Sequence, residues 1–345
     1  MQRIDITRLG MNGRRLAWCI AATAAAIFTA NESTAQELSP AAEQAFAGFV
    51  TSAPQRTFYL AADGAGYSWS GVGGETPAQA VTTGLRSCLE RWKTGCRLYA
   101  VNNFLLGGRD WWKVVEARSP KAVDIGRMRP QPYWGNSGPA HATGLVVWSH
   151  DYEEAGDRTT SAPGPYVGYF TKAGYDLYRF DRRWTRDLSA DATQFVDMLR
   201  QARTMGYRRI VLAGLGAGAW VSLVAASRGA PVDGVIAVAP EYRSEAKAMV
   251  DASTARSDWQ KVTAALPAGP RILVVNFARN AADTTASHAD DARAAFSASG
   301  ANAVVVVDPP DFPDRASTQK PGFGLAYGGC IWRFIEAGER EAPCQ

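Results

Sequence analysis

The segment from Tyr207 to Ala226 constrains the fold more than any other part of the chain. It reads YRRIVLAGLGAGAWVSLVAA, in which a short run of β-branched residues and leucine precedes a turn with three glycines and a long apolar stretch. The short run predicts a buried strand, and the apolar stretch is long enough to form a helix. Because glycines separate the two, the segment is expected to pass from strand to helix through one sharp turn.

The turn has the spacing G-x-S-x-G of a nucleophile elbow, except that its central residue is Gly216. In such an elbow a strained backbone presents a serine hydroxyl to the substrate. A positive φ costs a non-glycine residue about 1–3 kcal/mol, and glycine removes that strain together with the hydroxyl. The sequence therefore predicts the backbone of a hydrolase site without its nucleophile.

The same turn also fits G-x-G-x-x-A, the phosphate-binding turn of dinucleotide folds, through Gly214, Gly216 and Ala219. Glu241, at the end of the next expected strand, could then bind a ribose. However, Glu241 lies farther from Gly214 than the roughly 20 residues that are usual, and the turn does not follow the first strand of its region. A dinucleotide-binding oxidoreductase remains an alternative function.

The N-terminus is expected to be a secretory signal peptide comprising residues 1–35. A basic segment ending in Arg14 and Arg15 precedes the apolar run Leu16–Ala30, and Ala35 ends a stretch of small residues. An uncleaved anchor is the alternative, although 15 alanine-rich residues are short for a membrane span. The chain is therefore expected in the periplasm or outside the cell.

The formal net charge of +4 is partly carried by this leader, which leaves +2 for the rest of the chain. So small a net charge gives no reason to expect a nucleic acid or an anionic membrane as partner. The sequence identifies no protein partner either.

The cysteine pattern predicts two disulfides once the leader and its Cys19 are removed. An even number of cysteines in an exported chain favours disulfides, and the proximity of each pair in sequence favours Cys88 with Cys96 and Cys330 with Cys344. Zinc is the alternative, but the mature chain has no C-x-x-C and only three histidines. No metal site is expected.

Strand and helix patterns divide the mature chain into two domains. Residues 36–53 are expected as a linker with a short alanine-rich helix, and residues 54–118 as a small α+β domain. Residues 119–143 are rich in proline and glycine and are expected as a second, surface linker. From residue 144 to 345 strands alternate with helices, which predicts an α/β domain with a mostly parallel sheet covered by helices on both faces.

Two stretches of this second domain resemble the α/β-hydrolase superfamily, in particular esterases and dienelactone-hydrolase-like members. They are VVWSHD at 146–151, where these proteins have a strand ending in His-Gly, and AGLGAGAWVSL at 213–223, where they have G-x-S-x-G. The resemblance covers about 200 residues and implies a triad in the chain order nucleophile, acid, base.

The resemblance places glycine at the nucleophile position and leaves the other two positions altered. The nucleophile position is Gly216, the acid loop offers Asn280 or Asp283, and the base loop has Arg315 where a histidine is expected. Arginine cannot act as a general base near neutral pH, because its pKa is above 12 and its guanidinium has no acceptor lone pair. His150 and His288 are the residues that could substitute.

The elbow sequence retains backbone groups that are placed to bind a ligand. Backbone N–H groups at the start of the elbow helix form an anion-favouring nest, to which Arg315 could add charge. We therefore expect a catalytically degenerate hydrolase-fold protein that binds or scaffolds, with a small anionic or acyl ligand and no cofactor. An active esterase-type hydrolase using non-standard residues is the competing function. The expected ligand contacts are His150, Asp151, Gly214, Leu215, Gly216, Ala217 and Arg315.

Overall fold

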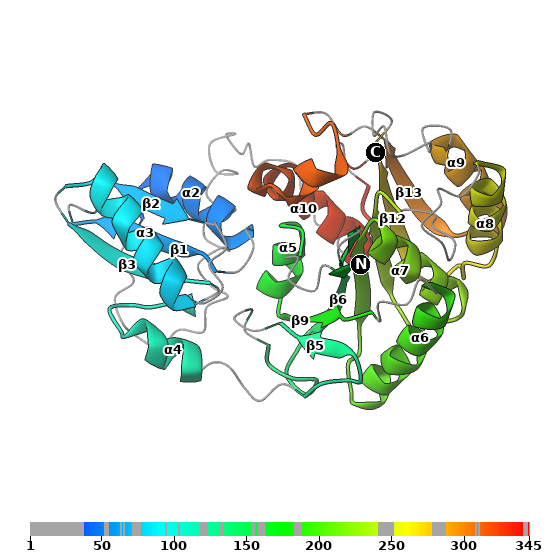
Figure 1. Ribbon diagram of the computed structural model, residues 1–345, viewed down its shortest axis with the longest axis horizontal. Helices are drawn as coiled ribbons and strands as arrows, with labels where there is room; N and C mark the ends of the chain where they lie inside the picture. The colour runs from blue at the N-terminus through cyan, green and yellow to red at the C-terminus, as the bar shows by residue number, and fades with distance from the viewer. Residues whose placement is uncertain are drawn as a thin grey trace, which may run out of the picture. The chain divides into compact units, whose positions relative to one another are not determined.

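Among the residues that it describes, the computed structural model has three sheets, of four, seven and two strands. Figure 1 shows the two larger ones. The structure describes residues 38–345 except 52–54, 63, 65, 71–76, 94, 103, 118–122, 132–133, 135, 154–155, 158–162, 183–187, 241–251, 278–287, 308, 310, 341–343 and 345. The expected signal peptide lies outside the described residues. Residues Glu37–Gln345 form one compact unit. No helix among the described residues is both long and apolar enough to cross a membrane.

The four-stranded sheet is antiparallel, with the order β2-β1-β3-β4. Its strands are β1 (Thr57–Ala61), β2 (Tyr67–Ser70), β3 (Cys96–Val101) and β4 (Phe104–Leu105), and the accompanying helices are α3 (Pro77–Arg91) and α4 (Trp111–Ala117). Helix α3 packs so closely on the sheet that a Cβ at Gly84 would collide with the Thr57 side chain. The unit has the mixed α+β character expected of residues 54–118.

Helix α2 (Pro40–Thr51) lies in the segment 36–53, which was expected as a linker with a short alanine-rich helix. Its Ala42 and Phe49 are fully buried, and the Phe46 ring lies edge-on to Phe58 of β1 at a centroid distance of 5.1 Å. Residues 42, 46 and 49 share one helical face, so a continuous apolar stripe meets the sheet. This segment therefore adds a helix to the core of the small unit.

The seven-stranded sheet has the order β13-β12-β11-β10-β6-β9-β5, with β10 at its centre. All neighbours are parallel except β5 and β9, which are antiparallel. The strands are β5 (Met128–Pro130), β6 (Gly144–Ser149), β9 (Tyr175–Phe180), β10 (Ile210–Leu215), β11 (Gly234–Val238), β12 (Arg271–Asn276) and β13 (Asn302–Val307). A short hairpin of β7 (Tyr152–Glu153) and β8 (Gly156–Asp157) follows β6.

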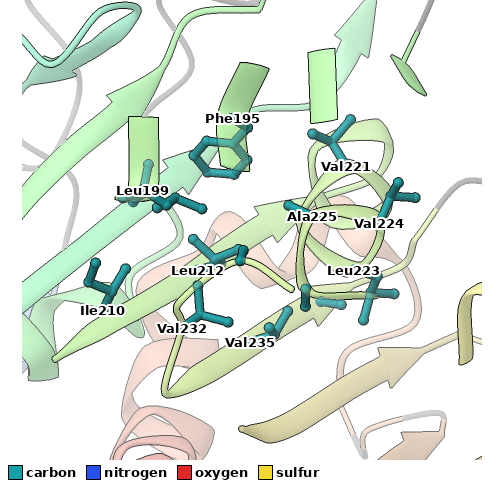
Figure 2. Packing of buried hydrophobic residues seen from close by; sticks show 14 of the residues in the cluster. Phe195, Leu199, Ile210, Leu212, Val221, Leu223, Val224, Ala225, Val232 and Val235 are labelled. Atoms are coloured by element: carbon teal, nitrogen blue, oxygen red, sulfur yellow. The ribbon is translucent and has the colours of Figure 1, made fainter. Parts of the chain in front are cut away.

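Helices cover both faces of this sheet, which confirms the predicted fold class (Figure 1). One face carries α6 (Leu188–Thr204), α7 (Ala217–Ser227), α8 (Ala252–Ala264) and α9 (His288–Ser299), and the other carries α5 (Val167–Lys172) and α10 (Pro321–Ala337). Figure 2 shows Leu212 of β10 and Val235 of β11 in one cluster with Val221 and Ala225 of α7. Because β10 is buried on both faces, its sequence is almost continuously apolar.

One detail differs from the sequence-based expectation. Strand β5 lies inside residues 119–143, which were expected as a surface linker; three residues are too few to show an alternating pattern. Helix α10 begins at Pro321 although glycines lower the helix propensity of its first turns. Two of its glycines allow close packing, since a Cβ at Gly324 would lie 2.8 Å from the Pro165 side chain and one at Gly328 would collide with the Tyr169 ring.

Both expected disulfides are formed. Cys88 at the end of α3 bonds to Cys96 at the start of β3, with a Cα–Cα distance of 6.2 Å. Cys330 of α10 bonds to Cys344, with a Cα–Cα distance of 6.0 Å. Each bond therefore joins residues close in sequence, as the pairing argument predicted.

Candidate functional site

The elbow between β10 and α7 has the strained backbone that its glycine spacing predicts. Gly216 has φ 55° and ψ −120°, a conformation that L-residues rarely adopt. Its N–H donates to the carbonyl of Val238 on β11 at 3.0 Å, which ties the turn to the neighbouring strand. Gly218 lies against the backbone of Ser149 and His150, where any Cβ would collide. The turn therefore has no room for a side chain at position 218, and its backbone at position 216 is free of strain only with glycine.

The carboxylate of Asp151 occupies the space where a nucleophile side chain would stand. A Cβ built on Gly216 would meet Asp151 Oδ1 and Cγ, both closer than the 3.0 Å that real Cβ atoms keep. The N–H of Ala217, the first residue of α7, donates to Asp151 Oδ1 at 3.2 Å. In a nucleophile elbow this N–H, from the residue after the nucleophile, helps to form the oxyanion hole. This N–H, expected to contact a ligand, therefore already bonds to a carboxylate of the chain itself.

Arg315 reaches the same carboxylate from the other side of the site. Its Nη1 lies 3.2 Å from Asp151 Oδ2, and the side chains are 27% and 8% exposed, respectively. Arg315 begins the 3-10 helix η2 (Arg315–Gln319), which Asp314 caps by accepting a hydrogen bond from the Ser317 N–H at 2.8 Å. A side-chain cap fixes the start of so short a helix. Arg315 is therefore presented from an ordered turn.

His150 and Arg182 support Asp151 from its backbone side. Arg182 Nη2 donates to the Asp151 carbonyl at 3.0 Å, and His150 Nδ1 lies 2.9 Å from that oxygen. Arg182 Nη2 is also 3.3 Å from His150 Nδ1. Burial, followed by the charge of Arg182, lowers the pKa of His150 to about 4. His150 is thus a neutral, fully buried side chain at neutral pH.

Five of the expected site residues come together: His150, Asp151, Gly216, Ala217 and Arg315. The other two expected ligand contacts serve packing. A Cβ at Gly214 would lie 2.5 Å from the Ala219 nitrogen, so Gly214 lets α7 approach β10. Leu215 is 6% exposed and belongs to the apolar core.

The acid position is not described. Asn280 and Asp283 lie outside the described residues, as does the side chain of His288, the first residue of α9. No group of three or more His, Cys, Asp or Glu side chains that could hold a metal ion occurs in the described part of the chain.

Sequence reasoning missed Arg182 and the direction of the Asp151 side chain. Arg182 follows β9, a neighbour of β6, so its proximity is a consequence of strand order. The position of Asp151 follows from the parallel register, in which Gly214 of β10 pairs with Ser149 of β6. Two residues farther along the chain from each of these, just past the strand ends, Gly216 and Asp151 lie against each other. Knowledge that β6 and β10 are neighbours would have predicted their contact.

Several solved structures resemble this chain. A Klebsiella pneumoniae protein described as a dienelactone hydrolase is 13% identical, with 55% of this chain and 88% of that protein covered and a TM-score of 0.37. A Pyrococcus furiosus esterase is 13% identical, with 56% and 82% covered and a TM-score of 0.43. Esterase B from Lactobacillus rhamnosis is 14% identical, with 57% and 77% covered and a TM-score of 0.41. These neighbours are α/β-hydrolase-fold proteins.

No protein-family model matches the chain, and no curated protein matches it.

Proposed function

We propose that this chain is an exported α/β-hydrolase-like protein that acts by binding or scaffolding and does not hydrolyse esters through a serine mechanism. The observation that carries this proposal is the Asp151 carboxylate in the space of the nucleophile, bonded to the Ala217 N–H. A substrate carbonyl would need both that space and that donor. Both are already taken by a group of the chain.

The base position supports the same proposal. Arg315 extends from the predicted base loop and pairs with Asp151, and a guanidinium cannot accept a proton. His150 is buried, and its low pKa makes it a weak general base near neutral pH. Among the described residues, His150 is therefore poorly suited to replace the missing base.

The position of Asp151 also argues against a dinucleotide at this turn. A pyrophosphate would have to approach the N-terminus of α7. There it would meet the Asp151 carboxylate, which is a like charge at the N–H group that a phosphate oxygen would use. Glu241, the residue proposed to bind the ribose, lies outside the described residues.

Export is part of this proposal and rests on the basic and apolar leader of the sequence together with the two disulfides. Cleavage after about Ala35 would leave four cysteines, all of which are paired in the structure. Intact-mass measurement of chain recovered from the extracytoplasmic fraction tests it. A full-length chain with free thiols in the cytosol would contradict export.

The experiment that tests the lack of serine hydrolysis combines ester turnover with covalent labelling. The mature chain is expected to give no turnover of p-nitrophenyl acetate or butyrate above the buffer rate. It should not react with a fluorophosphonate probe, and an active serine esterase measured in parallel provides the positive control. The variant Gly216→Ser should gain little, because a serine without a base remains a poor nucleophile.

Turnover by the wild-type chain that is abolished by His150→Asn or His288→Asn would overturn the proposal. That result would establish instead an esterase-type hydrolase with non-standard residues.

A further inference from the structure

The elbow has two donors that suit an anion, and a carboxylate of the chain already contacts both. One oxygen of Asp151 accepts a hydrogen bond from the Ala217 N–H, at the positive end of the 11-residue helix α7. The other oxygen lies 3.2 Å from Arg315 Nη1. A helix N-terminus and a guanidinium are both donors that proteins use to bind carboxylates and phosphates. The group held by these two donors is therefore a carboxylate, and the same donors suit other carboxylates and phosphates.

We infer that the Asp151 carboxylate is an internal ligand that closes the elbow against external anions, with Ala217 N–H and Arg315 as its receptor. Withdrawal of Asp151 would vacate the position of a carboxylate that both donors now contact. That position would then accept a small carboxylate or phosphate from solution.

The covalent tether makes this closure strong against free anions. A group held in place by the chain competes at an effective concentration of roughly millimolar or higher, whatever its intrinsic affinity. The Asp151 side chain is also only 8% exposed, so an incoming anion must displace it before gaining contact with either donor. Free carboxylates at low concentration are thus excluded in the resting state.

Glycine at position 216 leaves the room that the Asp151 carboxylate occupies. Any side chain at this position would collide with the Asp151 carboxylate, so the internal ligand fits only because residue 216 has none. The inference deepens the proposed function and rests on it, since a reacting serine and this ligand cannot share the space. Esterase assays test the proposed lack of serine hydrolysis, and anion-binding measurements test the internal ligand, so failure of either can be recognised separately.

The test is rescue of Asp151→Ala by the group that it lacks. Thermal unfolding is measured with formate, acetate or inorganic phosphate, and with acetamide as the neutral control. Asp151→Ala should gain roughly 2–4 °C in Tm at about ten times the Kd of the bound anion, and acetamide should have no effect. The wild-type chain should not show this saturable gain, because its site is occupied.

The double variant Asp151→Ala/Arg315→Ala should lose the rescue. Equal stabilisation of the wild-type chain by the same anions would overturn the inference, since it would show an open site. Absence of any anion effect in a folded Asp151→Ala chain would also overturn it.

Conservative variants keep the inference testable if Asp151→Ala does not fold. Asp151→Asn keeps the size of the side chain, Arg315→Gln shortens it while keeping it polar, and each substitution removes one charge. The loss of Tm caused by Arg315→Gln should be smaller in the Asp151→Asn background than in the wild-type chain. Equal losses in both backgrounds would show that the two side chains are not coupled, contrary to the inference.

Discussion

Gly216→Ala is the substitution that most directly probes the elbow. The added methyl must adopt φ 55°, which costs a non-glycine residue about 1–3 kcal/mol. It must also drive the Asp151 carboxylate back, because the two would otherwise lie closer than 3.0 Å. Breaking a buried, charge-assisted hydrogen bond costs about 1–3 kcal/mol more. The expected loss in free energy of unfolding is therefore about 2–6 kcal/mol.

The two contributions separate in a double-mutant cycle with Asp151→Ala. In that background the carboxylate is absent, so Gly216→Ala should cost only the backbone strain, about 1–3 kcal/mol. The coupling energy between the two substitutions should then be about 1–3 kcal/mol, and the double variant should be more stable than additivity predicts. Urea unfolding, followed by far-UV circular dichroism and fluorescence, provides the free energies.

Gly229 offers a matched control for the backbone term. It has φ 75°, and among the described residues no heavy atom apart from those of adjoining residues lies within 4 Å of the position that its Cβ would take. Gly229→Ala should therefore show strain alone and should be additive with Asp151→Ala to within about 0.5 kcal/mol. If Gly216→Ala is equally additive, Asp151 does not occupy the nucleophile space in solution, and the reasoning about the elbow fails.

Two further predictions concern stability. Because burial lowers the pKa of His150 from 6.5 to about 4, its protonation favours the unfolded chain. The free energy of unfolding should keep this contribution above pH 6.5 and lose up to about 3 kcal/mol of it between pH 6.5 and 4. Urea unfolding at a series of pH values across this window should show a flatter dependence of the free energy of unfolding on pH in His150→Asn than in the wild type; equal slopes in the two would refute the assignment. Replacing Cys88 and Cys96 together by serine should cost about 2–3 kcal/mol by release of the short loop between them, measured by urea unfolding, and an unchanged stability would contradict this estimate.

The fold could be predicted because its signals are local. Alternating strands and helices, the glycine turn after Leu215 and the proximity of the paired cysteines all follow from neighbouring residues. Strand β5 and the packing of the short helix expected in residues 36–53 were harder, since short elements gain their stability mainly from what they pack against. Their contribution is visible only once the partner strands are in place.

The candidate site could be predicted only in part, because its central contact depends on strand order. The sequence placed glycine at the elbow and Arg315 in the loop opposite. It could not show that Asp151 would turn into the elbow, which requires β6 beside β10 in parallel register. The burial of His150 against Arg182 likewise depends on β9 lying next to β6.

The mutual exclusion of Asp151 and a side chain at position 216 has an evolutionary consequence. A change from glycine to serine alone would introduce a collision, whereas loss of Asp151 alone would remove one ion pair of Arg315 and the acceptor of the Ala217 N–H. Each single step therefore leads to a less stable chain, and native proteins have little stability to spare. The effect of a substitution at either position therefore depends on the residue at the other, and this epistasis disfavours stepwise mutation toward a serine elbow.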